Sequence, residues 1–270
     1  MFIINYLEKL QNFILDTLFP IHCLFCQKYG DWICEECAKK ISILPIQVCP
    51  YCEKAISPAG RICPSCKDKF LGKNEIGPLD ALIVSAKYEK SGISRLVHCF
   101  KYNFIPDLGT PLAKIISEAI IFHNLPLPDF IIPIPLHSRR LRWRGFNQSE
   151  ILAKNLSEIL TPGFPLSVIS NFLIRKKYTT AQMKIKNYQE RQKNVKNIFG
   201  LNKDFQNQHS NHSSDNSKIR VALQDKTVLL IDDISTTGST LFEAGRILKS
   251  AGAKKVFGAV IARQEISLKK

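Results

Sequence analysis

The four Cys-x-x-Cys pairs between Cys23 and Cys66 restrict what the N-terminal part of this chain can fold into. They are CLFC, CEEC, CPYC and CPSC, and they hold eight of the nine cysteines. Two such pairs supply the four thiolates of a tetrahedral zinc site, so the chain has enough for two structural sites. Sequential pairing is the simplest arrangement, and interleaved pairing is the alternative. The predicted zinc ligands are Cys23, Cys26, Cys34 and Cys37 for one site and Cys49, Cys52, Cys63 and Cys66 for the other.

A disulfide framework is the competing interpretation of these cysteines, and it needs an oxidising compartment. The first 20 residues, MFIINYLEKLQNFILDTLFP, do not have the pattern of an export signal, because they lack a basic start and because Glu8 and Asp16 interrupt the apolar run. Their apolar residues recur at helical spacing and predict an amphipathic helix over residues 1–20. We therefore expect a cytoplasmic protein without a membrane span, with a double zinc-ribbon module over residues 21–70. The remaining cysteine, Cys99, is expected to be a packing residue.

Residues 71–270 predict an α/β domain. ALIVSAKY, DFIIPIP, KTVLLIDD and KKVFGAVIAR are apolar enough for buried strands, and LGTPLAKIISEAIIF, NQSEILAKNLSEIL and LFEAGRILKSAG have helical spacing. Asn147, with Glu150 three residues later, is the expected N-cap of the second helix. Alternation of strands and helices favours a parallel sheet covered on both faces. The polar stretch of residues 202–220 breaks this pattern and predicts a flexible loop.

The stretch VLLIDDISTTGSTL contains a buried strand, two adjacent acids and a hydroxyl-rich turn. A turn of this kind at a helix N-terminus presents backbone N–H groups and hydroxyls to an anion, and phosphate is the natural guest. Gly238 has no Cβ to obstruct the ligand, and Thr240 with Glu243 predicts a capping box for the helix. Asp232 and Asp233, expected at a solvent-facing strand end, can accept hydrogen bonds from ligand hydroxyls. A phosphate beside a diol describes a ribose 5-phosphate.

Arginines dominate the segment that follows the strand DFIIPIP. Arg139, Arg140, Arg142 and Arg144 are placed to neutralise a pyrophosphate or the phosphates of a nucleic acid. Trp143 among them could stack on a base or pack against a neighbouring loop. The segment from Arg175 to Lys196 predicts either a loop that closes over a charged ligand or an exposed basic helix. The net charge of +15 likewise favours anionic partners.

The quoted stretches resemble known proteins. VLLIDDISTTGSTL is similar to the phosphoribosyl pyrophosphate (PRPP) signature of type I phosphoribosyltransferases. IIPIPLHSRRLRWRGFNQSEILA, FKYNFIPDLG and the four cysteine pairs resemble the ComF family of competence-associated proteins, as does LIRKKYTTAQMKIKNYQERQKNVKNIFG through Arg175, Gln182, Arg191 and Asn194. The resemblance covers nearly the whole chain apart from the polar stretch. It implies that Asp232 and Asp233 hold the ribose hydroxyls and that the 5-phosphate is bound by Ser235, Thr236, Thr237, Gly238, Ser239 and Thr240.

The resemblance also implies a fold and a biological setting. The fold is a type I phosphoribosyltransferase-like α/β domain with a parallel sheet, preceded by the zinc ribbons, and magnesium accompanies PRPP. Two functions stay open: a PRPP-dependent transferase or PRPP-binding protein acting in DNA uptake, and a non-catalytic factor that binds single-stranded DNA. Candidate partners are PRPP, single-stranded DNA and other competence proteins. Thr236 stands where the purine-salvage branch has an aspartate base, so purine transfer is not expected and no catalytic residue is predicted.

Overall fold

The computed structural model describes residues 20–73, 75–89, 92–179, 195–202 and 223–264. It divides the chain into two compact units, Met1–Ser42 and Ile43–Lys270, each of which is treated by itself here. The two cysteine clusters predicted as one module therefore fall on either side of the division. The helix predicted before Pro20 and almost all of the loop predicted at residues 202–220 lie outside the described residues. No helix within the described ranges has the length and apolar character needed to cross a bilayer.

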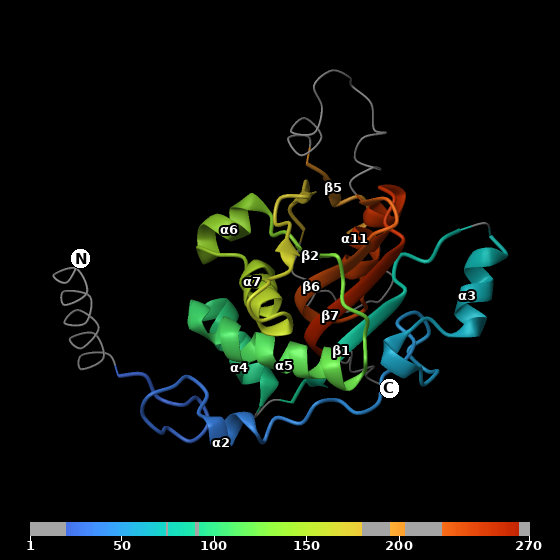
Figure 1. Cartoon of the computed structure of the whole chain (residues 1–270). Coiled ribbons are helices and arrows are strands. Elements are labelled where there is room, and N and C mark those ends of the chain that lie inside the picture. The colour runs from blue at the N-terminus through green and yellow to red at the C-terminus, as the bar shows by residue number, and fades with distance from the viewer. Residues whose placement is uncertain (1–19, 74, 90–91, 180–194, 203–222, 265–270) are drawn as a thin grey trace, which may run out of the picture. The chain divides into compact units, whose positions relative to one another are not determined.

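The larger unit is built on a five-stranded parallel sheet in the order β1-β7-β6-β2-β3 (Figure 1). Its strands are β1 (Ala81–Lys87), β2 (Phe130–Pro133), β3 (Ser167–Val168), β6 (Thr227–Ser235) and β7 (Lys255–Arg263). The central strands are buried on both faces, which is why their sequences are continuous apolar runs rather than alternating ones. The predicted fold class, an α/β phosphoribosyltransferase-like domain on a parallel sheet, is confirmed.

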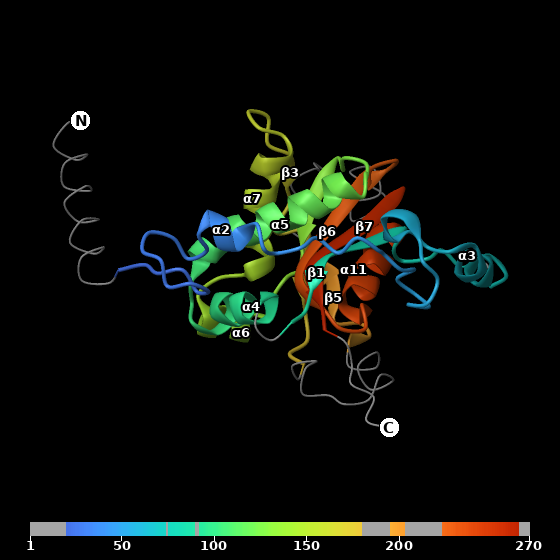
Figure 2. The ribbon, with the colours of Figure 1, turned by 90° about the horizontal axis from the view of Figure 1, so that it is seen from below.

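Helices cover both faces of this sheet (Figure 2). On one face lie α5 (Gly109–Phe122) and α7 (Gln148–Leu160), and on the other lies α11 (Ser239–Ser250). The predicted cap of α7 is confirmed, because Asn147 Oδ1 accepts the backbone N–H of Ser149 at 3.2 Å. Two further helices follow the carboxyl ends of strands: α4 (Ile93–Tyr102) follows β1, with η2 (Pro106–Leu108) after it, and α6 (Ser138–Arg144) follows β2.

The start of α11 differs from the prediction. Its N-cap is Gly238, which has a left-handed φ of 73° and no side chain, and the Thr237 hydroxyl accepts the backbone N–H of Ser239 at 3.4 Å. Thr240 lies inside the first turn, and the Glu243 carboxylate instead accepts the backbone N–H of Asn197 at 2.8 Å and pairs with Arg246. The predicted capping box of Thr240 and Glu243 is therefore wrong. A glycine that supplies the turn conformation has no side chain to cap with, and a long-range contact takes the glutamate.

Short elements complete the structure. A separate antiparallel pair joins β4 (Leu173–Arg175) to β5 (Phe199–Leu201), and β5 packs against α11. The basic segment predicted as a loop or helix begins at the last residue of β4, Arg175, and continues without regular structure over residues 176–179. Residues 180–194 lie outside the described part. The cysteine-containing segments form α2 (Glu35–Ala38), η1 (Pro58–Gly60) and α3 (Pro64–Leu71).

Candidate functional site

The chain reverses its direction across the sheet between β2 and β6. From β2 it continues through α7 to β3 on one side, and from β6 it continues through α11 to β7 on the other. Pairing between the two strands ends at Pro133 and Ile231, while β6 continues to Ser235 beside β7 alone. The last four residues of β6 therefore project beyond the end of β2. In open α/β sheets such a switch point is where ligands bind.

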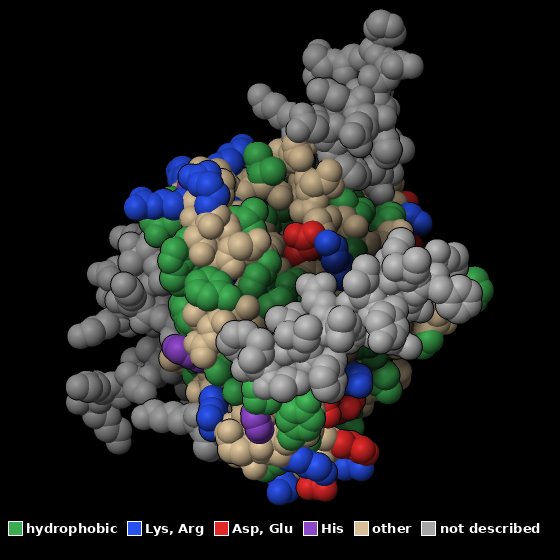
Figure 3. Space-filling view, turned by 90° about the vertical axis from the view of Figure 1, so that its left-hand side faces the viewer, with side chains coloured by type: hydrophobic (Ala, Val, Ile, Leu, Met, Phe, Trp, Pro, Cys, Tyr) green, Lys and Arg blue, Asp and Glu red, His purple; other side chains and the backbone are tan. Residues whose placement is uncertain are grey.

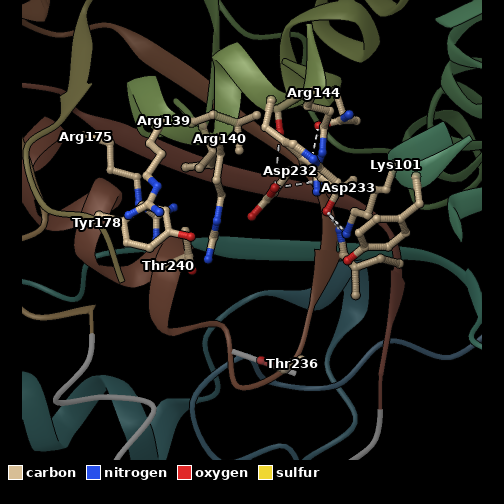
Figure 4. Close-up of a pocket in the computed structure, with 17 residues that line it drawn as sticks. Lys101, Arg139, Arg140, Arg144, Arg175, Tyr178, Asp232, Asp233, Thr236 and Thr240 are labelled. Carbon is tan, nitrogen blue, oxygen red and sulfur yellow. Dashed lines mark hydrogen bonds and ion pairs between the residues drawn. The ribbon is translucent and has the colours of Figure 1, made fainter. Parts of the chain in front are cut away.

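A cavity of about 650 Å³ lies at this point. It is lined mainly by polar and basic side chains from α4, α6, α7, β4 and the end of β6. The polar and aromatic lining residues are Lys101, Tyr102, Arg139, Arg140, Trp143, Arg144, Gln148, Ser149, Arg175, Tyr178, Asp232, Asp233, Thr236 and Thr240. In Figure 4, Asp232 lies between the arginines beside Tyr178 and the pair formed by Asp233 and Lys101. The cavity thus gathers residues that are up to 139 positions apart in the sequence, from Lys101 to Thr240.

Asp233 is buried and ion-paired rather than solvent-facing. Its side chain is 10% exposed, and Lys101 Nζ of α4 lies 2.8 Å from its Oδ1. The same oxygen accepts the backbone N–H of Ile234. The expectation that both acids face solvent is therefore wrong for Asp233. Successive strand side chains point to opposite faces, so Asp233 is turned toward the side from which the lysine reaches it.

Asp232 is half-buried and keeps contact with the cavity. Its Oδ1 accepts hydrogen bonds from Ser149 Oγ at 3.1 Å and from the backbone N–H of Asp233 at 2.9 Å. Burial, together with the negative charge of Asp233, raises the pKa of Asp232 to about 7. Near neutral pH this carboxyl therefore changes between a form that donates and a form that only accepts hydrogen bonds.

Two arginines of α6 and one of β4 converge with Tyr178 on the opposite side of the cavity. Arg139 and Arg140 lie 5.1 and 5.4 Å from the centre of the Tyr178 ring. Arg140 Nη2 also donates to the Thr179 carbonyl at 2.7 Å, and Arg175 Nη2 donates to Thr179 Oγ1 at 2.8 Å. Burial and then the charge of Arg140 lower the pKa of Arg175 to about 10. An anion bound here would offset this accumulated positive charge.

Arg144 occupies a more buried position and Arg142 an exposed one. The Arg144 side chain donates from Nη1 to Gln148 Oε1 at 2.7 Å, while its Nε is buried without a hydrogen-bond partner. Burial lowers the pKa of Arg144, and attraction to Asp233 opposes this effect. Arg142 is exposed and does not line the described cavity, unlike the other three predicted arginines. Figure 3 shows a group of Lys and Arg side chains at the upper left of the view, next to hydrophobic side chains.

The turn after β6 forms a small recess beside the main cavity. Of the predicted phosphate-binding residues, four line this recess: Ser235, Thr236, Gly238 and Thr240. Ser235 Oγ is buried there without a hydrogen-bond partner. The other two are turned inward, because Thr237 Oγ1 and Ser239 Oγ lie 2.6 Å apart in a hydrogen bond with each other. The recess therefore combines hydroxyls, an unsatisfied polar atom and a glycine in the conformation that opens backbone N–H groups to an anion.

Both cysteine sets have the geometry of closed four-sulfur sites. Within each set the sulfur atoms lie within 4.8 Å of one another, and all nine cysteines are free thiols. The sets are the sequential ones, so the interleaved alternative is wrong. Backbone N–H groups point at the sulfurs, as Cys34 N does toward Cys23 Sγ at 3.5 Å and Cys63 N toward Cys49 Sγ at 3.4 Å. Backbone hydrogen bonds from the Ala55 region lower the pKa of Cys52 to about 6, which favours the metal-binding thiolate.

Sequence reasoning missed several residues that the structure brings to the cavity. Lys101 lies within the quoted stretch FKYNFIPDLG, and Ser149 follows the N-cap of α7, yet nothing local to either indicates a partner on β6. Tyr178 was part of a basic segment without a clear period. The only available signal was a basic or hydroxyl residue close to a strand or helix end.

Comparisons with known proteins agree with this arrangement. The phosphoribosyl transferase domain model matches residues 149–270. Competence protein F of Haemophilus influenzae is 28% identical over 250 residues, which cover 89% of this chain and 96% of that protein. DNA utilization protein YhgH of Salmonella typhi is 28% identical over 245 residues, which cover 88% of this chain and 94% of that protein. The relationship to the ComF proteins expected from the sequence is thereby confirmed.

A more distant likeness is found among solved structures. The glutamine phosphoribosylpyrophosphate amidotransferase of B. subtilis, complexed with ADP and GMP, is 15% identical with a TM-score of 0.33. The match covers 57% of this chain and only 27% of that one. At this level the likeness carries no argument about function.

Proposed function

We propose that this relative of the ComF proteins binds phosphoribosyl pyrophosphate in the cavity at the carboxyl ends of β2 and β6. The observation that supports the proposal is the convergence of three groups on one cavity and the recess beside it: an acid pair, a hydroxyl turn with a left-handed glycine, and arginines from two elements. Each group matches one part of the ligand. A ribose diol needs carboxylate acceptors, a 5-phosphate needs N–H and hydroxyl donors, and a pyrophosphate needs cations.

Asp232 is the acid we assign to the diol. One of its oxygens is held by Ser149 and by the backbone, and this fixes the carboxylate in the cavity. Asp233 serves a different purpose in the proposal, because it is neutralised by Lys101 and braces the end of the strand. The recess formed by Ser235, Thr236, Gly238 and Thr240 takes the 5-phosphate.

Arg139, Arg140 and Arg175 are assigned to the pyrophosphate. In transfer chemistry the bond between C1 of the ribose and the pyrophosphate oxygen breaks, and negative charge accumulates on the leaving group. Guanidinium groups already placed at that charge stabilise it more than they stabilise the intact ligand. The carboxylates of the cavity are the hard oxygen ligands that magnesium prefers, and a bound ion would add to the neutralisation of pyrophosphate. The arrangement therefore supports binding of PRPP. It also supports transfer of the phosphoribosyl group to an acceptor, because the same arginines stabilise the pyrophosphate that leaves.

Calorimetry with PRPP and magnesium tests the proposal through Asp232→Asn. Loss of a charge-assisted hydrogen bond costs about 1.5–3 kcal/mol, so PRPP affinity should fall by roughly one to two decades. Asp129→Asn is the matched control, because Asp129 lies at the opposite end of β6, where it accepts the Thr227 N–H at 2.8 Å. PRPP affinity should not change in that variant.

Binding of inorganic pyrophosphate, which has no ribose diol, distinguishes recognition of the diol from the general effect of charge on anion binding. Removing a negative charge makes the cavity more attractive to any anion, so Asp232→Asn should bind pyrophosphate at least as tightly as wild type does. PRPP and pyrophosphate should thus respond in opposite directions. Weakening of both ligands to the same extent, or no PRPP binding by the wild type, would reject the assignment of the diol.

The biological setting and the metal are also part of the proposal. The names of the relatives support a role in the uptake or use of DNA. The two four-cysteine clusters support structural zinc, since closed sets of thiolates leave no open coordination position. Elemental analysis of protein purified in reducing buffer should find two zinc ions per chain. A folded protein without zinc would contradict the metal assignment.

A further inference from the structure

Three aromatic rings cluster at the rim of the cavity without being buried. They belong to Tyr102 at the end of α4, Phe104 in the turn after it, and Trp143 on α6. Their exposed fractions are 38%, 46% and 60%. The ring centre of Trp143 lies 6.3 Å from that of Tyr102 and 5.6 Å from that of Phe104. Exposed aromatic side chains that contact one another form a contiguous apolar patch, and such patches often mark an interaction surface or a ligand site.

The backbone holds this aromatic cluster outward. Phe104 has a φ of 57°, a left-handed conformation that few residues other than glycine adopt. In this conformation its ring meets Trp143 edge-on rather than entering the core. Strain of this kind persists where the surrounding structure maintains it, and it is concentrated at functional sites.

Positive charge surrounds the cluster. The Arg144 guanidinium lies 5.5 Å from the Tyr102 ring centre and 6.0 Å from that of Trp143. Tyr102 and Trp143 line the same cavity as Arg139 and Arg140. A ligand that fits this surface has a planar apolar part and negative charge close to it. Among biological ligands, a nucleotide base with its phosphate has this combination.

We propose that Tyr102, Phe104 and Trp143 form a stacking site for the heteroaromatic base of a nucleotide. The site shares its neighbouring arginines with the proposed PRPP cavity, but its three rings are not among the groups assigned to PRPP. The base can come from a free nucleotide or from a single strand, and both sources present the same planar ring beside a phosphate. Stacking on two or three rings recognises any base, because every base has a π-face.

Trp143 provides a direct measurement of stacking. The chain has two tryptophans, and Trp32→Phe leaves Trp143 as the only one. We expect its fluorescence to be quenched on titration with adenosine monophosphate and with a short single-stranded oligonucleotide. Ribose 5-phosphate and an abasic oligonucleotide of the same length should leave it unchanged. Quenching by the oligonucleotide at much lower concentration than by the nucleotide identifies a strand as the source, and the reverse identifies a free nucleotide.

Phe104→Ala tests the cluster independently of the fluorophore. Loss of a stacking ring should weaken binding of a labelled oligonucleotide or nucleotide by about 5–150-fold. Phe164→Ala is the matched control, because Phe164 is 87% exposed and lies in the turn after the C-terminal end of α7, whereas the N-terminal end of that helix lines the cavity. Phe104→Leu removes the ring but keeps an apolar side chain, and it should show a similar loss of affinity. This variant replaces the alanine variant if Phe104→Ala does not fold.

The outcome separates this proposal from the previous one. Asp232→Asn should lose PRPP affinity and retain quenching by bases, whereas Phe104→Ala should do the reverse. Equal quenching by abasic and base-bearing ligands would overturn the stacking site. So would equal affinities of the Phe104→Ala and Phe164→Ala variants for the base-bearing ligand.

Discussion

The two cysteine clusters have the same ligands and similar local hydrogen bonds, yet they hold different parts of the protein. The first, from Cys23 to Cys37, lies within the unit Met1–Ser42, and the second, from Cys49 to Cys66, lies within Ile43–Lys270. Each closes its loop with a backbone N–H that points at a cysteine sulfur. Within its own unit, the chain around the second cluster is hydrogen-bonded to the parallel sheet.

Hydrogen bonds connect the second cluster to β1 and to the residues before it. Gln47 makes two of them, from Nε2 to the Val84 carbonyl and from the Val84 N–H to Oε1, both at 3.0 Å. The Tyr51 hydroxyl donates to the Leu79 carbonyl at 2.8 Å and accepts the Leu79 N–H at 2.7 Å. Arg61 forms an isolated bridge with Ala81. The same metal-binding motif thus organises its own loop in one case and the edge of an α/β domain in the other.

The second cluster also lies behind the turn after β6 that we propose as the phosphate site. Tyr51, next to the ligand Cys52, stacks on Phe242 with ring centres 4.9 Å apart and planes inclined by 10°. A Cβ added to Gly238 would lie 3.1 Å from the same Phe242 ring. The path from metal ligand to turn therefore consists of two stacked rings. Through this contact the second cysteine cluster supports the backbone of the turn at Gly238.

The largest expected effect comes from removing one ligand of each cluster. Cys49→Ser should lower the stability of the larger unit by at least about 4 kcal/mol, because loss of a structural metal is among the severest single changes. This corresponds to a fall of about 8–16 °C in the unfolding temperature. Cys23→Ser should remove one zinc and leave that transition unchanged. Thermal unfolding and zinc content, measured on both variants, test this expectation. Equal shifts of the unfolding temperature in Cys49→Ser and Cys23→Ser would show that the two clusters do not differ in what they stabilise.

Gly238→Val should have the next largest effect. Its left-handed φ is strained for a β-branched residue, and its side chain would press on the ring that Tyr51 supports. We expect a loss of about 2–3 kcal/mol in stability, with weakened PRPP binding. Gly30→Val in the smaller unit is the control, because its φ is 118° and an added Cβ would meet nothing within 4 Å. Calorimetry in which both variants bind PRPP like wild type would show that the turn does not contact the ligand.

Tyr51→Phe sharpens the comparison by removing only a hydroxyl. The stacked ring remains, but the N–H and the carbonyl of Leu79 both lose their partner. The cost of leaving such groups unsatisfied is about 1–3 kcal/mol. Tyr29→Phe in the smaller unit, where Tyr29 is 63% exposed, should cost nothing measurable. Urea unfolding of the larger unit measures the difference, and similar midpoints for the two variants would contradict it.

The last prediction concerns the pH dependence of stability at the end of β6, which the second cluster supports. The raised pKa of Asp232 means that the folded protein binds more protons than the unfolded chain between about pH 4 and pH 7. Stability should therefore fall as pH rises through this window and level off above it. The Asp232→Asn variant lacks this pH dependence. The cysteines of both clusters are present in wild type and variant alike, so any pH dependence that they cause cancels when the two stabilities are subtracted.

Urea unfolding of wild type and Asp232→Asn at several pH values tests this prediction. The wild type should lose stability relative to the variant as the pH rises from about 4 to about 7. A difference that stays constant would show that Asp232 titrates in its ordinary range, and a change in the opposite direction would show that folding lowers its pKa. Either result would contradict the prediction.

Much of the site could be predicted because its signals are local. The strand, acid pair and turn of VLLIDDISTTGSTL are contiguous, and backbone geometry alone brings Asp232 near Gly238. The spacing within each Cys-x-x-Cys pair likewise places two sulfurs together. Asn147 was identifiable because an N-cap acts on residues two positions away.

The contacts that complete the site are of another kind. Lys101 reaches Asp233 across 132 positions of sequence, and Tyr51 reaches Phe242 across 191. Whether such residues meet depends on strand order and on the helices that cross the sheet, and neither is encoded in local periodicity. The predicted capping box failed for the same reason, because Asn197 and Arg246 determine where Glu243 points.

By itself, the sequence determined which groups are available: eight paired thiols, an acid pair at a strand end, a hydroxyl turn and a run of arginines. The tertiary structure decided which of them meet and in what state. It buried Asp233 against a lysine, raised the pKa of Asp232, turned two hydroxyls of the loop inward and joined the second cysteine cluster to β1. Burial and charge pairing are properties of the packed molecule, since both depend on neighbours that are distant in the chain.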